Sequence, residues 1–188
     1  MRDSSDGTAG RVSMVSDLVH GGMSVGKFGW KAQIRNLIQF AGDAYLNEMG
    51  NHQSAFQRLH DAPPSRALGR NNNVDAGEKV FNTIGCDSCH VATLRTGSSD
   101  IAALRQKTFH PYSDFPLHDM GSLGDGIVQG AASAREIRTA PLWGLRMVTR
   151  YLHDARATTL DQAVLARDRY KALDPKEKGK LLAFLNSL

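Results

Sequence analysis

Two cysteines and a histidine stand together at Cys86, Cys89 and His90, in the pattern C-x-x-C-H. Two thiols at this spacing can each add to one vinyl group of the same porphyrin, and the adjacent imidazole then lies under the iron as its proximal ligand. The pattern therefore predicts one covalently attached haem c. Cys86 and Cys89 would be its attachment points and His90 its proximal iron ligand.

A C-x-x-C pair also occurs as half of a zinc site or as a redox-active dithiol. A zinc site would need two further ligands at close spacing, and the chain has only these 2 cysteines. A thioredoxin-like dithiol needs a βαβ setting, which the surrounding sequence does not predict. Haem attachment is the interpretation that the neighbouring residues favour.

Residues 109–121 concentrate aromatic side chains, histidine and methionine. Because Met and His are the usual sixth ligands of haem iron, His118 and Met120 are candidates for its distal side. The alternative is structural, with a hydrogen bond for His118 and packing for Met120. At an open distal position, His118 or His153 could instead act as the acid–base group in O–O cleavage.

Two arginines, Arg138 and Arg146, are candidates for pairing with the haem propionates. A planar guanidinium suits bidentate binding of a carboxylate. Ordinary surface ion pairs are the alternative for both residues.

Helices are predicted on both sides of the C-x-x-C-H pattern. The first, over residues 30–50, follows the helical spacing of its apolar residues. The second begins at Asp75, with Glu78 completing a capping box, and Gly85 ends it directly before Cys86. In this helix Phe81 would cover the haem edge, and Gly77 would permit the close approach of another helix.

Two more helices are predicted after residue 158. Thr159 and Gln162 form a capping box for a short one, and Asp174 followed by Pro175 begins the last. The last helix carries an apolar stripe that must be buried, and the expected partner is the helix before the haem motif. The stripe consists of Leu181, Leu182, Phe184, Leu185 and Leu188.

These elements predict a mostly α, cytochrome-c-like haem domain over residues 74–188, with long loops and a short β-hairpin around residues 112–127. Residues 1–73 are expected to form an irregular leader, the peripheral helix at about 30–50 and a linker. A chain of 188 residues is long enough to bury a core.

Composition and charge indicate which classes of binding partner suit the chain. With 41% hydrophobic and 22% charged residues, the chain suits a soluble globular protein, and no apolar run has the length of a membrane span. No basic run interleaved with aromatics indicates nucleic acid. The net charge of +4 suits a redox partner protein with an acidic surface, although it is also explained by solubility alone.

Six sequence blocks make the chain resemble the bacterial di-haem oxidoreductase family, relatives of the di-haem cytochrome c peroxidases. In order, they are FGWKAQ at 28–33, GCDSCH at 85–90, PYSDFPLHDMG at 111–121, RTAPLWGL at 138–145, YLHDARATTL at 151–160 and LLAFLNSL at 181–188. Family members usually have two haem domains, and this chain looks like the C-terminal one. The resemblance implies a redox partner or a missing N-terminal haem domain.

The chain departs from the family pattern at two places. The loop that carries the distal ligand in relatives looks shortened after Ala166, and Ala155 stands where relatives tend to have glycine. The iron would then be five-coordinate, or capped by Met120, His118 or Tyr170.

Three functions are compatible with these residues. The first is an electron-transfer domain with one haem c. The second is a peroxidase-like haem enzyme with an open distal site. The third is a truncated remnant without haem.

Residues 1–7 lack the apolar core of a secretory signal, whereas haem c is normally attached outside the cytoplasm. We expect a periplasmic location, with the export signal outside this chain.

Overall fold

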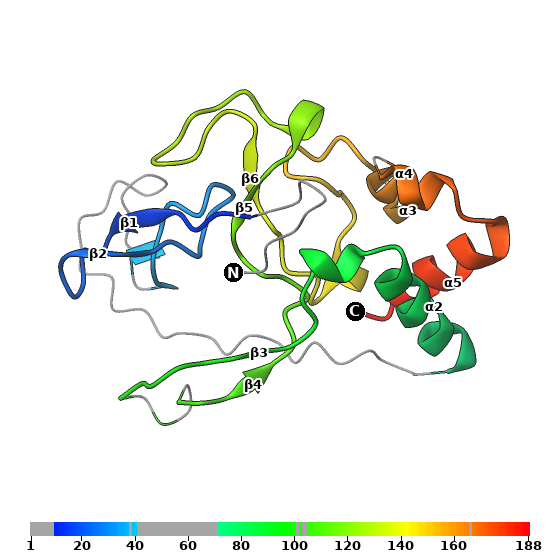
Figure 1. Cartoon of the computed structure of the whole chain (residues 1–188), viewed down its shortest axis with the longest axis horizontal. Coiled ribbons are helices and arrows are strands. Elements are labelled where there is room, and N and C mark those ends of the chain that lie inside the picture. Colours follow the sequence, from blue (N-terminus) through cyan, green and yellow to red (C-terminus); the bar gives the residue numbers. More distant parts are fainter. Residues whose placement is uncertain (1–9, 38, 41–70, 101, 103–104, 166) are drawn as a thin grey trace. The chain divides into compact units, whose positions relative to one another are not determined.

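The computed structural model describes residues 10–37, 39–40, 71–100, 102, 105–165 and 167–188 (Figure 1). Its contacts divide the chain into two compact units, each made of two separate segments. Unit 1 contains Met1–Ala62 and Phe115–Ala140, and unit 2 contains Pro63–Asp114 and Pro141–Leu188. Residues 115–140 therefore cluster with N-terminal residues, although the sequence places them inside the predicted haem domain.

Unit 1 is built from short antiparallel strand pairs. Strands β1 (Met14–Ser16) and β2 (Met23–Val25) form one pair, and β5 (Leu117–Asp119) and β6 (Glu136–Arg138) form another. The 3-10 turn η2 (Gly121–Leu123) follows β5. A small core forms around Ala32, Leu117 and Ala132, each at most 1% exposed.

A buried lysine links the loops of unit 1. The side chain of Lys31 is almost fully buried, and its Nζ lies 2.7 Å from Asp125 Oδ1 and 2.7 Å from the carbonyl oxygen of Glu136. Because a buried ammonium group is costly unless it is paired, these contacts fix the position of the 125–136 segment on the turn that carries Lys31.

Two predictions for unit 1 were wrong. Residues 28–34 form a turn closed by a bridge between Phe28 and Ile34, so no helix begins at Trp30; helical geometry starts at Leu37, and residues 41–50 lie outside the described part. The predicted hairpin over 112–127 does not form either. β5 lies inside that range, but its partner β6 comes later in the chain, with His118 opposite Ile137.

Unit 2 carries the C-x-x-C-H pattern between two packed helices, α2 (Asn72–Thr83) and α5 (Pro175–Leu185) (Figure 1). Between them come the turns η1 (Cys86–Ser88) and η3 (Leu145–Met147), strands β3 (Leu94–Arg95) and β4 (Thr108–Phe109), and helices α3 (Leu160–Val164) and α4 (Asp168–Lys171). β3 and β4 pair antiparallel. The core contains Val74, Phe81, Tyr112, Leu160, Tyr170, Leu181, Phe184, Leu185 and Leu188.

The close packing of α2 on α5 confirms the expected partner of the last helix. A Cβ atom on Gly77 would lie only 2.0 Å from the carbonyl oxygen of Lys180. Glycine therefore lets the two backbones approach, as the sequence predicts.

Capping residues define the helices of unit 2. The predicted starts are confirmed at Thr159, which accepts from the Gln162 N–H at 3.2 Å, and at Asp174, which accepts from the Glu177 N–H at 2.8 Å. The start predicted at Asp75 was wrong. The N-cap is Asn71, whose side chain accepts from two N–H groups and adds a turn to α2.

The fold class is mixed rather than mostly α. The described residues form four α-helices and three two-stranded antiparallel sheets. These strands are two or three residues long, too short to give a period-two pattern in the sequence. No helix in this part of the chain has the length and apolar character needed to cross a membrane.

Candidate haem-attachment site

The two cysteines lie on one turn at the end of α2. Gly85 has a left-handed φ of +77° and turns the chain from α2 into η1. Cys86 begins η1, and the N–H of His90 donates to the carbonyl of Cys86 at 2.9 Å. Cys86 and Cys89 are both half-buried and form no disulfide. Cys86, Cys89 and His90 therefore share one backbone turn.

The imidazole of His90 is oriented by the main chain of Tyr112. His90 Nδ1 lies 2.8 Å from the Tyr112 carbonyl oxygen. A carbonyl only accepts, so Nδ1 carries a proton, and in the neutral ring the lone pair is then on Nε2. This tautomer is the one that binds a metal through Nε2, and a backbone carbonyl is a common partner for the other nitrogen of such a histidine.

Aromatic packing supports the same imidazole. The ring of Phe81 is 2% exposed and lies 6.4 Å from the ring of His90, centroid to centroid. Phe81 also meets Tyr112 at 6.1 Å and Phe184 at 5.4 Å in edge-on arrangements. The Tyr112 hydroxyl donates to Glu78 at 3.4 Å. Phe81 thus connects His90 to the α2–α5 core, and its predicted contact with a haem edge remains a prediction.

The surroundings of Cys86 are apolar with positive charge nearby. Burial raises the pKa of the Cys86 thiol to about 11, and Arg167 and Arg169 act in the opposite direction. The thiol packs on the core of unit 2 with other half-buried apolar side chains. An apolar lining suits a porphyrin face. Other partly buried residues packed against the same core include Ile84, Ala92, Leu142, Leu145 and Tyr151.

Three further candidates belong to unit 1. His118 is buried on β5, Met120 follows it, and Arg138 ends β6. Arg138 donates to the Gly29 carbonyl at 2.7 Å, and its guanidinium carbon lies 5.8 Å from the centre of the Phe115 ring. These contacts give Arg138 a structural role, and a role for any of the three at a haem remains a prediction.

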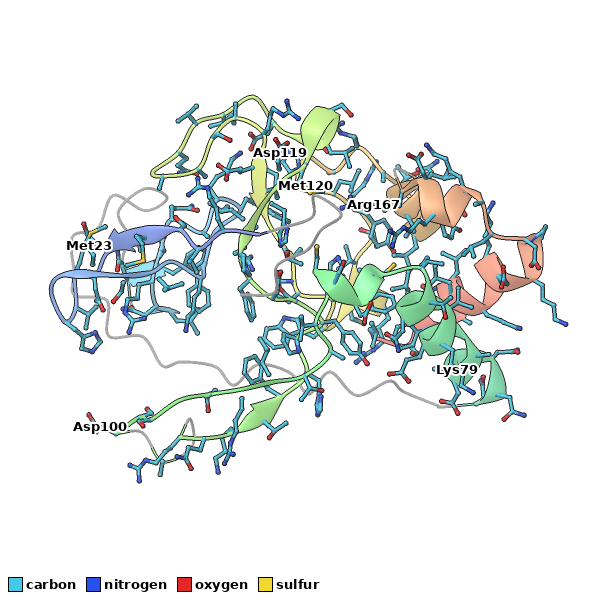
Figure 2. All side chains as sticks on the ribbon, in the orientation of Figure 1. Met23, Lys79, Asp100, Asp119, Met120 and Arg167 are labelled. Atoms are coloured by element: carbon cyan, nitrogen blue, oxygen red, sulfur yellow. The ribbon has the colours of Figure 1, made fainter. Side chains whose placement is uncertain are left out.

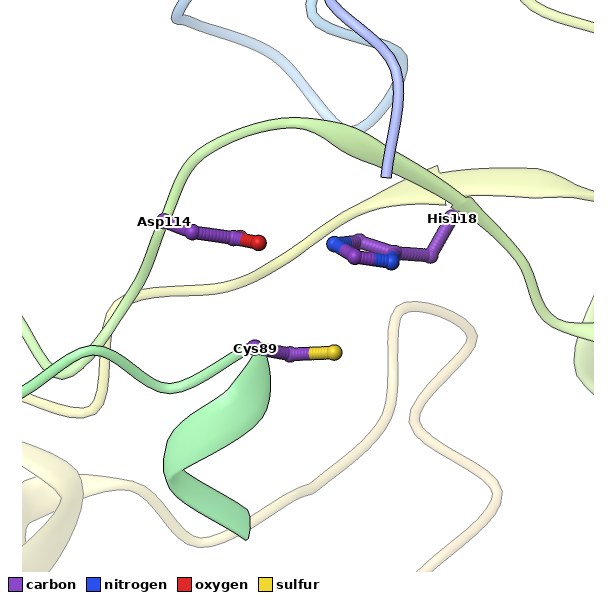
Figure 3. A group of neighbouring side chains, drawn as sticks. All are labelled: Cys89, Asp114 and His118. Atoms are coloured by element: carbon purple, nitrogen blue, oxygen red, sulfur yellow. The ribbon is translucent and has the colours of Figure 1, made fainter. Parts of the chain in front are cut away.

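Figure 3 labels Cys89 and Asp114, which both belong to unit 2. Within unit 2, the N–H of Asp114 donates to the carbonyl oxygen of Cys89 at 2.8 Å. This bond ties the chain after Tyr112 to the end of the C-x-x-C-H turn.

The last candidates lie in unit 2. Arg146 is exposed and donates to the Leu188 main-chain oxygen at 2.6 Å, and His153 is half-buried in the segment after η3. Tyr170 is fully buried, and its hydroxyl donates to the Asp161 carboxylate. Burial and this carboxylate raise the pKa of Tyr170. In this arrangement the phenol stays protonated, which disfavours it as a phenolate ligand.

The backbone at position 155 has a conformation that suits glycine better than alanine. Ala155 has a φ of +60°, in the left-handed region that favours glycine. A glycine would adopt this conformation without strain. Ala155 follows Asp154, whose carboxylate pairs with Arg156.

Sequence reasoning missed Tyr112 as the residue that orients His90. Its contribution is a main-chain oxygen, so no side-chain pattern could have indicated it. It also missed Arg167 and Arg169 as the cations beside Cys86, because they come much later in the chain than the motif.

Comparison with known proteins identifies a family for most of the chain. Residues 51–188 match the model of a family described as "di-haem oxidoreductase, putative peroxidase". No curated protein and no solved structure was found to match the chain.

Proposed function

Because the chain belongs to the di-haem oxidoreductase family, we propose that it carries one haem c on Cys86 and Cys89, with His90 as the proximal ligand, and transfers electrons through it. The observation that carries the proposal is the 2.8 Å contact between His90 Nδ1 and the Tyr112 carbonyl, directly after a C-x-x-C pair free of a disulfide. The bound haem would supply a one-electron couple of iron.

The protein residues would hold and tune this group. The two thioethers would fix the porphyrin, and Phe81 and Tyr112 would keep the His90 ring in place. The hydrogen bond at Nδ1 makes Nε2 a stronger electron donor to a metal. Apolar side chains around Cys86 would exclude water and lower the local dielectric, which sets the iron potential together with the axial ligands.

The proposed setting is the bacterial periplasm, where haem c is normally attached. The proposed partner is a redox protein or an N-terminal haem domain, as in the family that the chain resembles.

A mass and a spectrum test the proposal. The chain is expressed behind an export signal in a host that attaches haem c, and the intact mass is measured with the reduced absorption spectrum. We expect the mass of one added haem and a low-spin spectrum. Cys86→Ala with Cys89→Ala should remove the added mass. A folded wild-type chain without added mass would contradict the proposal and leave a haem-free remnant as the function class.

A histidine pair tests the axial ligand. His90→Gly should keep the covalent haem but lose the low-spin spectrum, and added imidazole should restore it. His110→Gly is the matched control, because His110 is exposed and binds Thr93 Oγ1 through Nδ1 at 2.9 Å. An unchanged spectrum in His90→Gly would show that His90 is not the ligand.

A peroxidase-like enzyme with an open distal site is the second candidate. The family description names a peroxidase, and the Tyr170 phenol is engaged with Asp161. His118 or His153 would then be the acid–base group. A high-spin spectrum with rapid peroxide turnover would favour this function, whereas a six-coordinate iron without turnover would exclude it.

A further inference from the structure

The β3–β4 hairpin follows the proposed haem-attachment motif in the chain. β3 begins soon after His90, and β4 ends soon before Tyr112, the residue whose carbonyl orients the His90 imidazole. At the base of the hairpin, the Ser113 N–H donates to the Val91 carbonyl at 3.0 Å. Both ends of the hairpin are therefore anchored at the proximal side of the proposed haem.

Internal hydrogen bonds order the outer part of the hairpin. The Thr96 N–H donates to the Lys107 carbonyl at 2.9 Å, and the Lys107 N–H donates to Thr96 Oγ1 at 2.7 Å. Further out, the Gln106 N–H donates to the Gly97 carbonyl at 3.0 Å. The two strands thus form one ribbon, which ends near Asp100 (Figure 2).

The ribbon carries exposed positive charge. Arg95, Arg105 and Lys107 are all exposed, and Asp100 is the single acidic residue in the sequence from 91 to 110. Both guanidinium groups donate to main-chain carbonyls of the hairpin, at 3.2 Å for Arg95 and 2.6 Å for Arg105. None of the three cations meets a carboxylate at ion-pair distance within the described residues. Their charge is therefore presented to solvent.

We propose that this basic hairpin is the docking arm for an acidic redox protein. The proposal rests on the haem attachment proposed above. A field from uncompensated cations steers an acidic protein and raises its association rate. A two-stranded hairpin is marginally stable alone, and these exposed side chains bury no core. Recognition explains why such charges stand on an arm anchored at His90 and Tyr112.

Docking at this arm would serve a one-electron transfer. An acidic donor gives up one electron and the ferric haem iron becomes ferrous, so the exchange is balanced without a further reactant. A plant-type ferredoxin is a suitable probe, because its low reduction potential makes it a donor to most haems.

Two double charge-reversal variants distinguish an effect of the hairpin charges from an effect of the overall net charge. Arg95→Glu with Lys107→Glu alters the hairpin. Lys79→Glu with Lys176→Glu alters exposed positions on α2 and α5. Each pair reverses two positive charges, so the net charge changes equally. Stopped-flow reduction of the haem by reduced ferredoxin gives the second-order rate constant.

At low salt we expect the hairpin pair to lower this rate constant about tenfold, and the control pair less than about twofold. The difference should disappear at high salt, where exposed charges are screened. Equal losses in the two pairs would show that net charge alone acts and would overturn the proposal. An unchanged rate in the hairpin pair would overturn it as well.

The haem mass and reduced spectrum of every variant are recorded first, so that loss of haem is not mistaken for loss of docking. Should the wild-type chain hold no haem, the proposed function fails by itself. Calorimetric titration of that haem-free chain with oxidised ferredoxin then tests the arm. Weaker binding by the hairpin variant, but not by the control variant, supports docking at the hairpin. Equal binding by the wild-type chain and the hairpin variant contradicts it.

Discussion

Replacing Gly77 by alanine tests whether the close packing of α2 on α5 supports the haem-motif unit. The new Cβ would lie 2.0 Å from the carbonyl oxygen of Lys180 and 2.7 Å from Cβ of Phe184. Neither atom can rotate away, because one belongs to the main chain and the other is attached directly to it. The two helices must therefore move apart.

The expected loss follows from two opposing effects. Overpacking of a well-packed contact costs about 1–3 kcal/mol. Alanine in a helix regains up to about 1 kcal/mol relative to glycine. Because the clash is with backbone, the cost lies at the upper end, and the net loss is about 2 kcal/mol. For a chain of this size, the melting temperature should fall by roughly 4–8 °C.

Gly179 supplies the matched control within α5. Apart from its chain neighbours and the backbone of its own helix, no atom lies within 4 Å of a Cβ built there. Gly179→Ala should therefore raise the free energy of unfolding by about 0.5–1 kcal/mol. Urea unfolding followed by circular dichroism measures both variants. A Gly77→Ala protein as stable as wild type would refute the packing argument, since the same substitution would then have no cost at either site.

Three further predictions concern other parts of the chain. Ala155→Gly should raise the free energy of unfolding by about 1 kcal/mol, because it relieves a left-handed alanine; a loss of stability in urea would contradict this. Lys31→Met should lower that free energy by about 3–5 kcal/mol, because Asp125 loses its buried cation; thermal melting of the whole chain measures it, and an unchanged melt would contradict it. The hydrogen bond from Arg11 lowers the pKa of Glu136 to about 2, so this carboxylate stabilises the fold above about pH 5, and that contribution is lost as the pH falls towards 2. Glu136→Gln should flatten this acid limb of the stability profile, and an equally steep limb would show that other carboxylates cause it.

The parts of the fold that the sequence predicts are those with local signals. Asp174 followed by Pro175 marks the start of α5, because both the cap and the ring act within one turn. Gly85 likewise marks the end of α2, since its left-handed φ is a property of one residue. At the other end of α2, the N-cap is Asn71 and not Asp75. Either side chain can cap a helix, and the earlier cap adds a turn.

The parts that the sequence misses depend on residues far apart in the chain. Strand β5 has two buried residues followed by an exposed one, so it carries no alternating pattern that could indicate a partner. Its pairing with β6 is supported by the segment around Asp125 and Lys31. Trp30 and Ile34 have helical spacing, but the main chain of Phe28 bonds across to Ile34 and makes a turn. Local propensity is overridden there by tertiary contacts.

The same distinction applies within the site. Cys86, Cys89 and His90 are recognisable because their side chains carry the chemistry at a fixed spacing. The group that selects the His90 tautomer is a carbonyl oxygen, which every residue type has, so the identity of Tyr112 carries no signal for this role. The β3–β4 hairpin connects His90 to Tyr112 and so brings the Tyr112 carbonyl back to the His90 ring. A change in the hairpin can thus reach the His90 imidazole through the backbone, without altering any residue of the C-x-x-C-H motif.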